Sequence, residues 1–144
     1  MKEALRLAVE AGKRGDRPVG AVIVHKKKII ARGSSRLNTL NSRVHHAENT
    51  AIFSCASYLK EHGPECTLYT TLEPCIMCLG AMIHARIKRL IYGCPDPKGG
   101  AAVSLYQLGN DNRLNHQIEV RGGVLAEECG ALLSRFFQTL RSSK

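Results

Sequence analysis

Apolar residues recur at helical spacing near both ends of this chain and in short extended runs between them. Residues 3–14 and 125–141 carry apolar side chains three and four positions apart, which predicts an amphipathic helix in each segment. Short apolar runs predict strands at 19–24, 29–31, 67–71, 90–92 and 118–120. A polar turn with three lysines separates the first two runs, so we expect these two strands to form a hairpin.

Two further helices are predicted in the middle of the chain. The inward face of the helix over 45–61 comprises Ile52, Cys55, Ala56 and Leu59. Glu48 lies one turn before Ile52, so its carboxylate should point toward the same buried side. Residues 75–85 are apolar nearly all round, which predicts a helix enclosed by protein. Helices that alternate with apolar strands indicate an α/β fold with three layers.

The composition fits one globular domain over residues 1–144, with 44% hydrophobic residues. Lysine and arginine outnumber the acidic residues by 21 to 12, and the net charge of +9 favours a polyanionic partner such as nucleic acid. No apolar run reaches the roughly 18 residues that span a bilayer, and the first residues do not have the layout of a signal peptide. We therefore expect a cytoplasmic protein with no membrane partner.

One histidine and two cysteines have the spacing of a metal site. Cys75 and Cys78 are three residues apart at the start of a predicted helix, which places both sulfurs on one side of its first turn. Together with His46 they suit a tetrahedral Zn²⁺ that keeps one position open, as catalytic zinc sites do. Because His46 also lies at a helix start, we predict that two helix N-termini face one zinc ion.

Glu48 is the expected proton-transfer residue beside this zinc. Zinc lowers the pKa of bound water from about 15.7 toward about 7, which makes the water a nucleophile for a ring carbon that bears an amino group. A carboxylate whose pKa is raised by burial can act first as a base and then as an acid. His46 and Glu48, with Pro74, Cys75 and Cys78, form the H-x-E and P-C-x-x-C signature of zinc nucleobase deaminases.

Other interpretations of these residues stay open at this point. A fourth ligand, perhaps from Cys66 or Cys94, would close the zinc site and make it structural. A cysteine–histidine nucleophile is a weaker alternative, because two cysteines three apart favour a metal. A non-catalytic, zinc-stabilised RNA-binding module would have no need of Glu48. Four cysteines lie among apolar residues and are expected to be reduced core thiols: Cys55, Cys66, Cys94 and Cys129.

Blocks spread over residues 3–140 resemble the cytidine-deaminase superfamily, and within it bacterial tRNA adenosine deaminases. These blocks are 17–22, 71–78, 80–84, 100–102, 115–116, 123–129 and 136–137. The resemblance implies a three-layer αβα sandwich with a five-stranded mixed sheet, a homodimer, and conversion of adenosine to inosine at the wobble position of a tRNA anticodon arm. By residue match, His46, Cys75 and Cys78 bind Zn²⁺. Glu48 is then the catalytic residue.

Four residues are expected to contact the substrate: Ser35, Ala47, Asp96 and Phe137. The resemblance places Asp96 and Phe137 near the rim that faces the RNA. Ser35 occupies the position at which family members usually carry an asparagine that contacts the target base. Without that amide one polar edge of the base is not recognised, a change that can alter discrimination between bases by orders of magnitude.

Further departures from the family pattern leave two candidate substrates. Residues 42–44 are Ser-Arg-Val in place of the usual Asp-Pro-Thr, and His45 replaces a small residue. Residues 46–52 also resemble free guanine deaminases, and residues 68–72 resemble fungal cytosine deaminase. The sequence thus predicts a zinc-dependent tRNA adenosine deaminase. The alternative is a deaminase of a free nucleobase or small heterocycle, such as cytosine, guanine or a related aminated ring.

Overall fold

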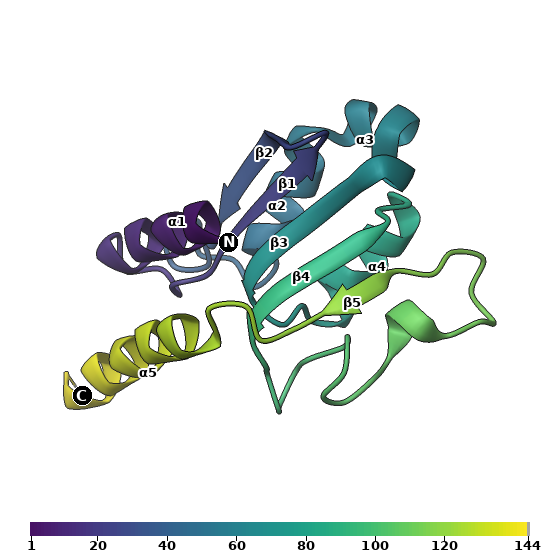
Figure 1. The fold of residues 1–144 in the computed structure, drawn as a ribbon. Helices are drawn as coiled ribbons and strands as arrows, with labels where there is room; N and C mark the ends of the chain where they lie inside the picture. The colour runs from purple at the N-terminus through teal and green to yellow at the C-terminus, as the bar shows by residue number, and fades with distance from the viewer. Residues whose placement is uncertain (144) are drawn as a thin grey trace.

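The computed structural model describes residues 1–143, which fold around one five-stranded sheet (Figure 1). The strands are β1 (Gly20–His25), β2 (Lys28–Ser34), β3 (Cys66–Leu72), β4 (Arg89–Cys94) and β5 (Glu119–Arg121). Their order across the sheet is β2-β1-β3-β4-β5. β1 runs antiparallel to both β2 and β3, whereas β3, β4 and β5 are parallel. The predicted mixed sheet and its first hairpin are therefore confirmed.

Helices cover both faces of the sheet. They are α1 (Lys2–Lys13), α2 (Ala47–Ser54), α3 (Ala56–His62), α4 (Ile76–His84) and α5 (Ala126–Ser142), with short 3₁₀ turns η1 (Gly63–Glu65) and η2 (Leu108–Asn110). α1 and α5 contact each other and the sheet, while α2 and α4 form a second contacting pair on the sheet (Figure 1). The three-layer αβα sandwich is confirmed. No helix within residues 1–143 has the length and hydropathy of a membrane span.

Two glycines let helices from opposite layers approach the hairpin closely. Gly20 of β1 faces α1, and a Cβ there would lie 2.0 Å from the carbonyl oxygen of Ala4. Gly33 of β2 faces α2, and a Cβ there would lie 2.2 Å from the carbonyl oxygen of Ala47. Because side chains alternate between the faces of a sheet, these contacts place α1 and α2 on opposite faces. The contact at Gly33 also fixes the N-terminus of α2 against the sheet.

The main core lies between the sheet and the layer that contains α2 and α4. Ile23, Leu68 and Leu90 come from three adjacent strands and are fully buried in one cluster with Leu79 and Met82 of α4. Burial of each such side chain contributes about 1.5–3 kcal/mol relative to exposure. This packing anchors α4, and with it the helix start that carries the two predicted cysteine ligands.

The helix predicted over 45–61 is instead two helices that meet at Cys55. Cys55 has φ −131° and ψ 31°, which ends α2, and Ala56 is exposed rather than inward. The Ser54 hydroxyl and the Cys55 thiol both donate to the carbonyl oxygen of Ala51, at 2.7 and 3.4 Å. Side-chain bonds of this kind compete with the helical backbone ladder. The single-helix prediction was therefore wrong at this point.

The prediction that residues 75–85 form a helix apolar on all sides and enclosed by protein was also wrong in part. α4 buries Cys78, Leu79, Met82 and Ile83 on one side. Ile76 is 57% exposed and His84 is exposed. The helix lies on the sheet as an outer layer, so only the side that contacts the sheet and α2 is covered within one chain.

Candidate zinc centre and its cavity

His46, Cys75 and Cys78 converge where two helices begin. His46 is the N-cap residue of α2, Cys75 is the N-cap residue of α4, and Cys78 lies in the first turn of α4. The Nδ1 atom of His46 is 3.5 Å from the Sγ atom of each cysteine. The free N–H groups and the dipole at a helix start favour thiolates over thiols. The structure thus brings together the three residues that the motif spacing singled out.

The three donor atoms have the spacing that a tetrahedral zinc ion requires. Zn–S and Zn–N bonds of about 2.3 and 2.05 Å at the tetrahedral angle place sulfur and nitrogen about 3.6 Å apart. The observed separations of 3.5 Å match this value. A hydrogen bond from Cys78 and another from His46 lower the pKa of the Cys75 thiol, which favours the thiolate form that binds metal.

Neither alternative fourth ligand approaches this cluster. The Cys66 thiol donates to the carbonyl oxygen of His62, and the Cys94 thiol to that of Thr71, at 3.2 and 3.6 Å. Among the described residues, the metal-binding group at this place consists of His46, Cys75 and Cys78 alone. Three protein ligands are typical of a catalytic zinc site with one open position rather than a closed structural site.

Glu48 lies beside the three donors in the first turn of α2. Its side chain is only 4% exposed, and the hydroxyl of Thr70 on β3 donates to Oε1 at 2.8 Å. Burial raises the pKa of the Glu48 carboxyl. A buried acid with a raised pKa can both accept and return a proton near neutral pH.

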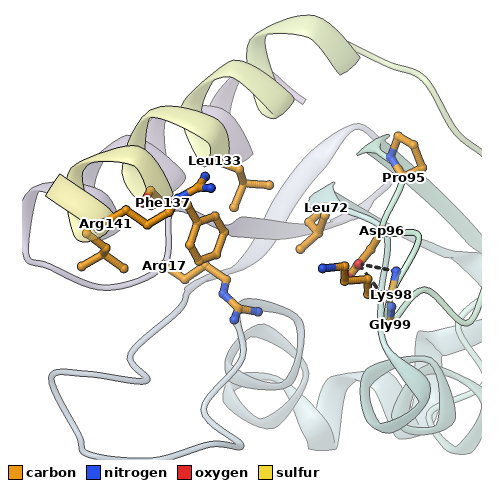
Figure 2. Close-up of a pocket in the computed structure, with 10 residues that line it drawn as sticks. Arg17, Leu72, Pro95, Asp96, Lys98, Gly99, Leu133, Phe137 and Arg141 are labelled. Atoms are coloured by element: carbon orange, nitrogen blue, oxygen red, sulfur yellow. Dashed lines mark hydrogen bonds between the residues drawn. The ribbon is translucent and has the colours of Figure 1, made fainter. Parts of the chain in front are cut away.

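A small inner pocket at these residues opens into a wide groove. The pocket has a volume of about 40 Å³, and its walls include Ser35, His46 and Glu48. The groove, of about 840 Å³, shares Arg17, Leu72 and Asp96 with the pocket. Figure 2 shows Leu72 between α5 on one side of this groove and the loop that carries Asp96 on the other. A group bound in the groove can therefore present one part of itself to the pocket.

Ser35 has an unused hydrogen-bonding group at the wall of the pocket. Its side chain is 2% exposed, and its Oγ has no hydrogen-bond partner. Its backbone N–H donates to the carbonyl oxygen of Val19, which fixes the residue in place. A buried hydroxyl normally finds a partner, and Ser35 is one of the residues that line the pocket.

Asp96 and Phe137, the two residues assigned to the rim, both line the groove. Asp96 accepts hydrogen bonds from the backbone N–H groups of Lys98 and Gly99, at 3.1 and 3.2 Å (Figure 2). Phe137 extends from α5, and the guanidinium carbon of Arg17 lies 5.7 Å from its ring centroid. This cation–π contact connects α5 to the segment that precedes β1.

Ala47 and His45 lie outside the cavity walls described for residues 1–143. The Ala47 side chain is fully buried in a small core cluster with Val19 and Ala21. His45 is exposed, with Nδ1 2.7 Å from the hydroxyl of Ser42, and it is not part of the metal-binding group.

Glu73 is a buried residue of the site that the sequence did not reveal. It accepts four backbone hydrogen bonds of 2.8–3.2 Å, from Asp96, Ala102, Val103 and Ser104, and a fifth from the Ser104 hydroxyl. Desolvation opposes ionisation of Glu73, but these bonds outweigh it and lower the pKa of its carboxyl. The loop from residue 95 to 104 is thus wrapped around one carboxylate. The only sequence signal was the position of Glu73 directly before Pro74 and Cys75.

Another buried carboxylate, Asp16, holds the loop that contains Leu37. Asp16 is fully buried and accepts hydrogen bonds from the backbone N–H groups of Asn38 and Thr39, at 2.9 and 2.8 Å. The hydroxyl of Thr39 also donates to it, and the Nε of Arg14 lies 3.2 Å away. Leu37, within this loop, lines the pocket.

Comparisons with known proteins agree with this geometry. Residues 1–94 match the family model of the cytidine and deoxycytidylate deaminase zinc-binding region. The chain is 44% identical to the tRNA-specific adenosine deaminase of Bacillus subtilis, with 100% of this chain and 90% of the relative covered. It is also 44% identical to the enzyme of that name from Haemophilus influenzae, with 100% and 84% covered.

Two solved structures of deaminases have the same fold as this chain. A structure from work on A-to-I editing by tRNA:A34 deaminases at the wobble position of transfer RNA has a TM-score of 0.85 and 40% identity, and covers 92% of this chain and 97% of that one. Guanine deaminase from Nitrosomonas europaea has a TM-score of 0.77 at 21% identity, over 94% and 81% of the two chains, and so shares the fold.

Proposed function

Because this chain belongs to the zinc-binding cytidine and deoxycytidylate deaminase family, we propose that it hydrolyses adenosine to inosine at the wobble position of a tRNA anticodon. The family makes it a zinc-dependent hydrolase of an amino group on a nucleobase. The choice of a tRNA adenosine is supported by full-length relatives named for that activity. It is also supported by the shape and charge of the groove.

The groove in front of the pocket is the observation that carries this proposal. Its walls contain three cationic residues, Arg17, Lys98 and Arg141, against one acidic residue, Asp96. Phe137 adds an aromatic face that is 38% exposed (Figure 2). Basic grooves with aromatic side chains suit single-stranded nucleic acid, because phosphates bind the cations and bases stack on the rings. A free base would need neither the cations nor a groove of this size.

In this proposal His46, Cys75 and Cys78 hold the zinc ion. Zinc supplies, when bound, a water molecule whose pKa is lowered toward about 7. Bound zinc would also keep Cys75 and Cys78 as thiolates and His46 as a neutral imidazole. The remaining steps belong to side chains of the chain itself.

Glu48 moves the protons of the reaction. It accepts a proton from the attacking water and delivers it to the ring nitrogen next to the reacting carbon. It then takes the second proton of the former water from the hydroxyl group now on the carbon and passes it to the amino group, which leaves as ammonia while the oxygen remains as a carbonyl. Thr70 keeps Oε1 hydrogen-bonded throughout and so fixes the direction in which the carboxylate faces. Adenosine in the RNA and water are thereby converted to inosine and ammonia.

Ser35 and the groove position the base. The Ser35 hydroxyl, which is buried and without a partner, donates to or accepts from the edge of the flipped base. Arg17, Lys98 and Arg141 bind the phosphates on either side. Phe137 stacks against a neighbouring base of the loop. Extrusion of the base costs least in a single-stranded loop, which agrees with an anticodon as the substrate.

An RNA stem-loop assay tests this assignment. We expect the enzyme to form inosine in an anticodon stem-loop with adenosine at the wobble position, and to leave the same stem-loop with adenosine moved into the paired stem unchanged. Ammonia release from free adenine, guanine and cytosine should stay at the level of a Glu48→Gln control. Ammonia release from a free base without RNA editing would instead establish the small-ring alternative and refute the tRNA assignment.

We further propose that the enzyme is a homodimer and acts in the cytoplasm, where its tRNA substrate resides. Phe53 on α2 is 70% exposed and borders an apolar groove of about 490 Å³ between α2, α3 and α4. A second copy of the chain that covers this face would bury Phe53. Light scattering should give twice the chain mass for the native enzyme and a monomer for Phe53→Lys. A native monomer would refute this part.

A further inference from the structure

A second group of metal-binding side chains lies at the end of the sheet opposite the zinc centre. His25 ends β1, His62 ends α3, and Glu65 follows in η1. One ligand atom from each lies within 4.8 Å of the others. His25 pairs with Cys66, the first residue of β3, whereas the zinc cavity adjoins the last residue, Leu72. We propose that His25, His62 and Glu65 bind a second divalent transition-metal ion that takes no part in deamination.

The separations between the donor atoms agree with one shared ion. The Nε2 of His25 is 3.0 Å and the Nδ1 of His62 is 3.5 Å from the Oε2 atom of Glu65. Imidazole nitrogen and carboxylate oxygen bound to one tetrahedral zinc ion lie about 3.4 Å apart. The two measured distances lie on either side of this value, so small side-chain rotations are enough to admit an ion.

Tyr58 holds His25 in the orientation that a metal ligand needs. Its hydroxyl forms a hydrogen bond with the Nδ1 of His25, which leaves Nε2 for the ion. Histidine ligands in metal sites commonly have their second nitrogen engaged in this way, because the bond fixes the ring. The His25 and His62 rings are stacked with centroids 5.0 Å apart, and the Tyr58 ring lies 4.5 Å from that of His62. The packing of the three rings thus holds the two histidine side chains close together before an ion binds.

The donor set and the local charge define the class of ion. Two imidazoles and one carboxylate prefer Zn²⁺, Ni²⁺ or Cu²⁺ to Mg²⁺ or Ca²⁺, which select oxygen ligands. The Glu61 carboxylate, 3.7 Å from Nε2 of His62, adds negative charge. The lysines at 26–28 add positive charge at the neighbouring turn. Since Glu65 is 59% exposed, the ion can enter from solvent and keep water ligands.

The ion would connect the β1–β2 hairpin to the segment between α3 and β3, which are linked here by hydrogen bonds. His25 belongs to the β1–β2 hairpin, and His62 and Glu65 belong to the connection between α3 and β3. Bound metal stabilises the folded state by mass action, since the unfolded chain does not hold the three ligands together. The site is thus expected to raise the melting temperature and to leave turnover unchanged.

Metal counting on the zinc-loaded enzyme tests this site. After equilibrium dialysis against micromolar ZnCl₂, we expect about two zinc ions per native chain and about one in His62→Gln and in Glu65→Gln. Both side chains are partly exposed, so both variants should fold, which circular dichroism will check. His84→Gln is the matched control, because His84 is an exposed histidine outside the cluster, and it should keep about two ions.

Thermal unfolding supplies a second readout. Starting from enzyme already saturated at the His46–Cys75–Cys78 site, added ZnCl₂ should raise the melting temperature of the native enzyme and of His84→Gln by more than it raises that of His62→Gln or Glu65→Gln. A native stoichiometry of one zinc ion per chain would overturn the proposal. So would a second ion that persists in both cluster variants, since that ion would be bound elsewhere.

Discussion

Thr70 donates its hydroxyl to the Oε1 atom of Glu48 at 2.8 Å, so the central strand of the sheet holds the carboxylate that lies beside the zinc ligands. Thr70 is fully buried and Glu48 is 4% exposed. A buried carboxylate without a partner is strongly unfavourable. The hydrogen bond between β3 and α2 offsets part of this cost and keeps the acid in one orientation.

Replacement of Glu48 by glutamine should lower turnover at least about 100-fold and leave the zinc in place. Glutamine has nearly the same shape but cannot carry a proton, and the loss of a general acid–base typically lowers rates by about 10²–10⁴-fold. Inosine formation and zinc content, measured on the same sample, check this. A variant that loses its zinc would show that Glu48 belongs to the metal site rather than to proton transfer.

Thr70→Val should produce a smaller defect of the same kind. The valine preserves the volume of the side chain and removes only the donor to Glu48. We expect zinc content to stay unchanged and kcat to fall more than KM rises. An unchanged kcat would mean that the hydrogen bond contributes to stability alone.

Cys75→Ala should lose its zinc and much of its stability, because metal binding and folding are coupled. The two remaining donors, His46 and Cys78, cannot hold the ion as tightly. Zinc content and the yield of soluble protein measure the effect. Cys55→Ala is the control, since Cys55 is also partly buried but lies outside the metal-binding group. Loss of zinc from that variant would contradict the assignment.

Glu73→Gln should loosen the loop from residue 95 to 104. The amide that replaces one carboxylate oxygen would face backbone N–H donors, and a buried donor left without an acceptor costs about 1–3 kcal/mol. We expect a lower unfolding midpoint in urea and a raised KM for the stem-loop, because Asp96 is carried by this loop. Ser104→Ala, which removes one donor, should have a weaker effect. Equal effects would show that Ser104 alone holds the loop.

Asp16 should make stability fall with acid. Its desolvation raises the pKa, but hydrogen bonds from Thr39, Asn38 and Arg14 outweigh it, and the pKa of Asp16 is lowered below its ordinary value of 3.8. The folded state therefore binds fewer protons than the unfolded chain, so this contribution is fully present above about pH 4 and is lost as pH falls through the folded pKa. Urea unfolding between pH 7 and pH 3 should show a shallower decline in Asp16→Asn than in the native chain.

Lys98→Gln and Arg141→Gln should each weaken RNA binding and reduce its dependence on salt. Each lost phosphate contact to a single strand lowers the slope of log K against log salt concentration by about 0.7. Binding titrations at several salt concentrations measure the slope. Arg113→Gln is the control, because it removes the same single positive charge. The Arg113 side chain is 86% exposed and pairs with Asp111 away from the groove. The same change in slope for all three variants would mean that only net charge matters.

The metal donors could be predicted from the sequence because they lie within short segments. Cys75 and Cys78 are three residues apart at a helix start, and the local geometry of one turn brings their sulfurs together. His46 was recognisable by its distance of two residues from Glu48. The strands were likewise predictable, since each is a local apolar run.

The two buried carboxylates that hold the loops beside the cavity could not be predicted in this way. Glu73 bonds to residues 23 to 31 positions away, and Asp16 to residues 22 and 23 positions away. Such contacts depend on the path of a loop, which no periodicity encodes. The break at Cys55 escaped prediction for a different reason: the apolar spacing continues across it, and the side-chain bonds from Ser54 and Cys55 to Ala51 leave no periodic signal.

Arg17, Leu72 and Asp96 belong to the walls of both the inner pocket and the outer groove. A substitution at any of these positions therefore changes both the affinity for the ligand in the groove and the position of the reacting base in the pocket. Discrimination between bases and affinity for the substrate are therefore coupled in this enzyme. Libraries that randomise the three positions jointly should reach altered specificities that one-at-a-time mutagenesis would discard as weak binders.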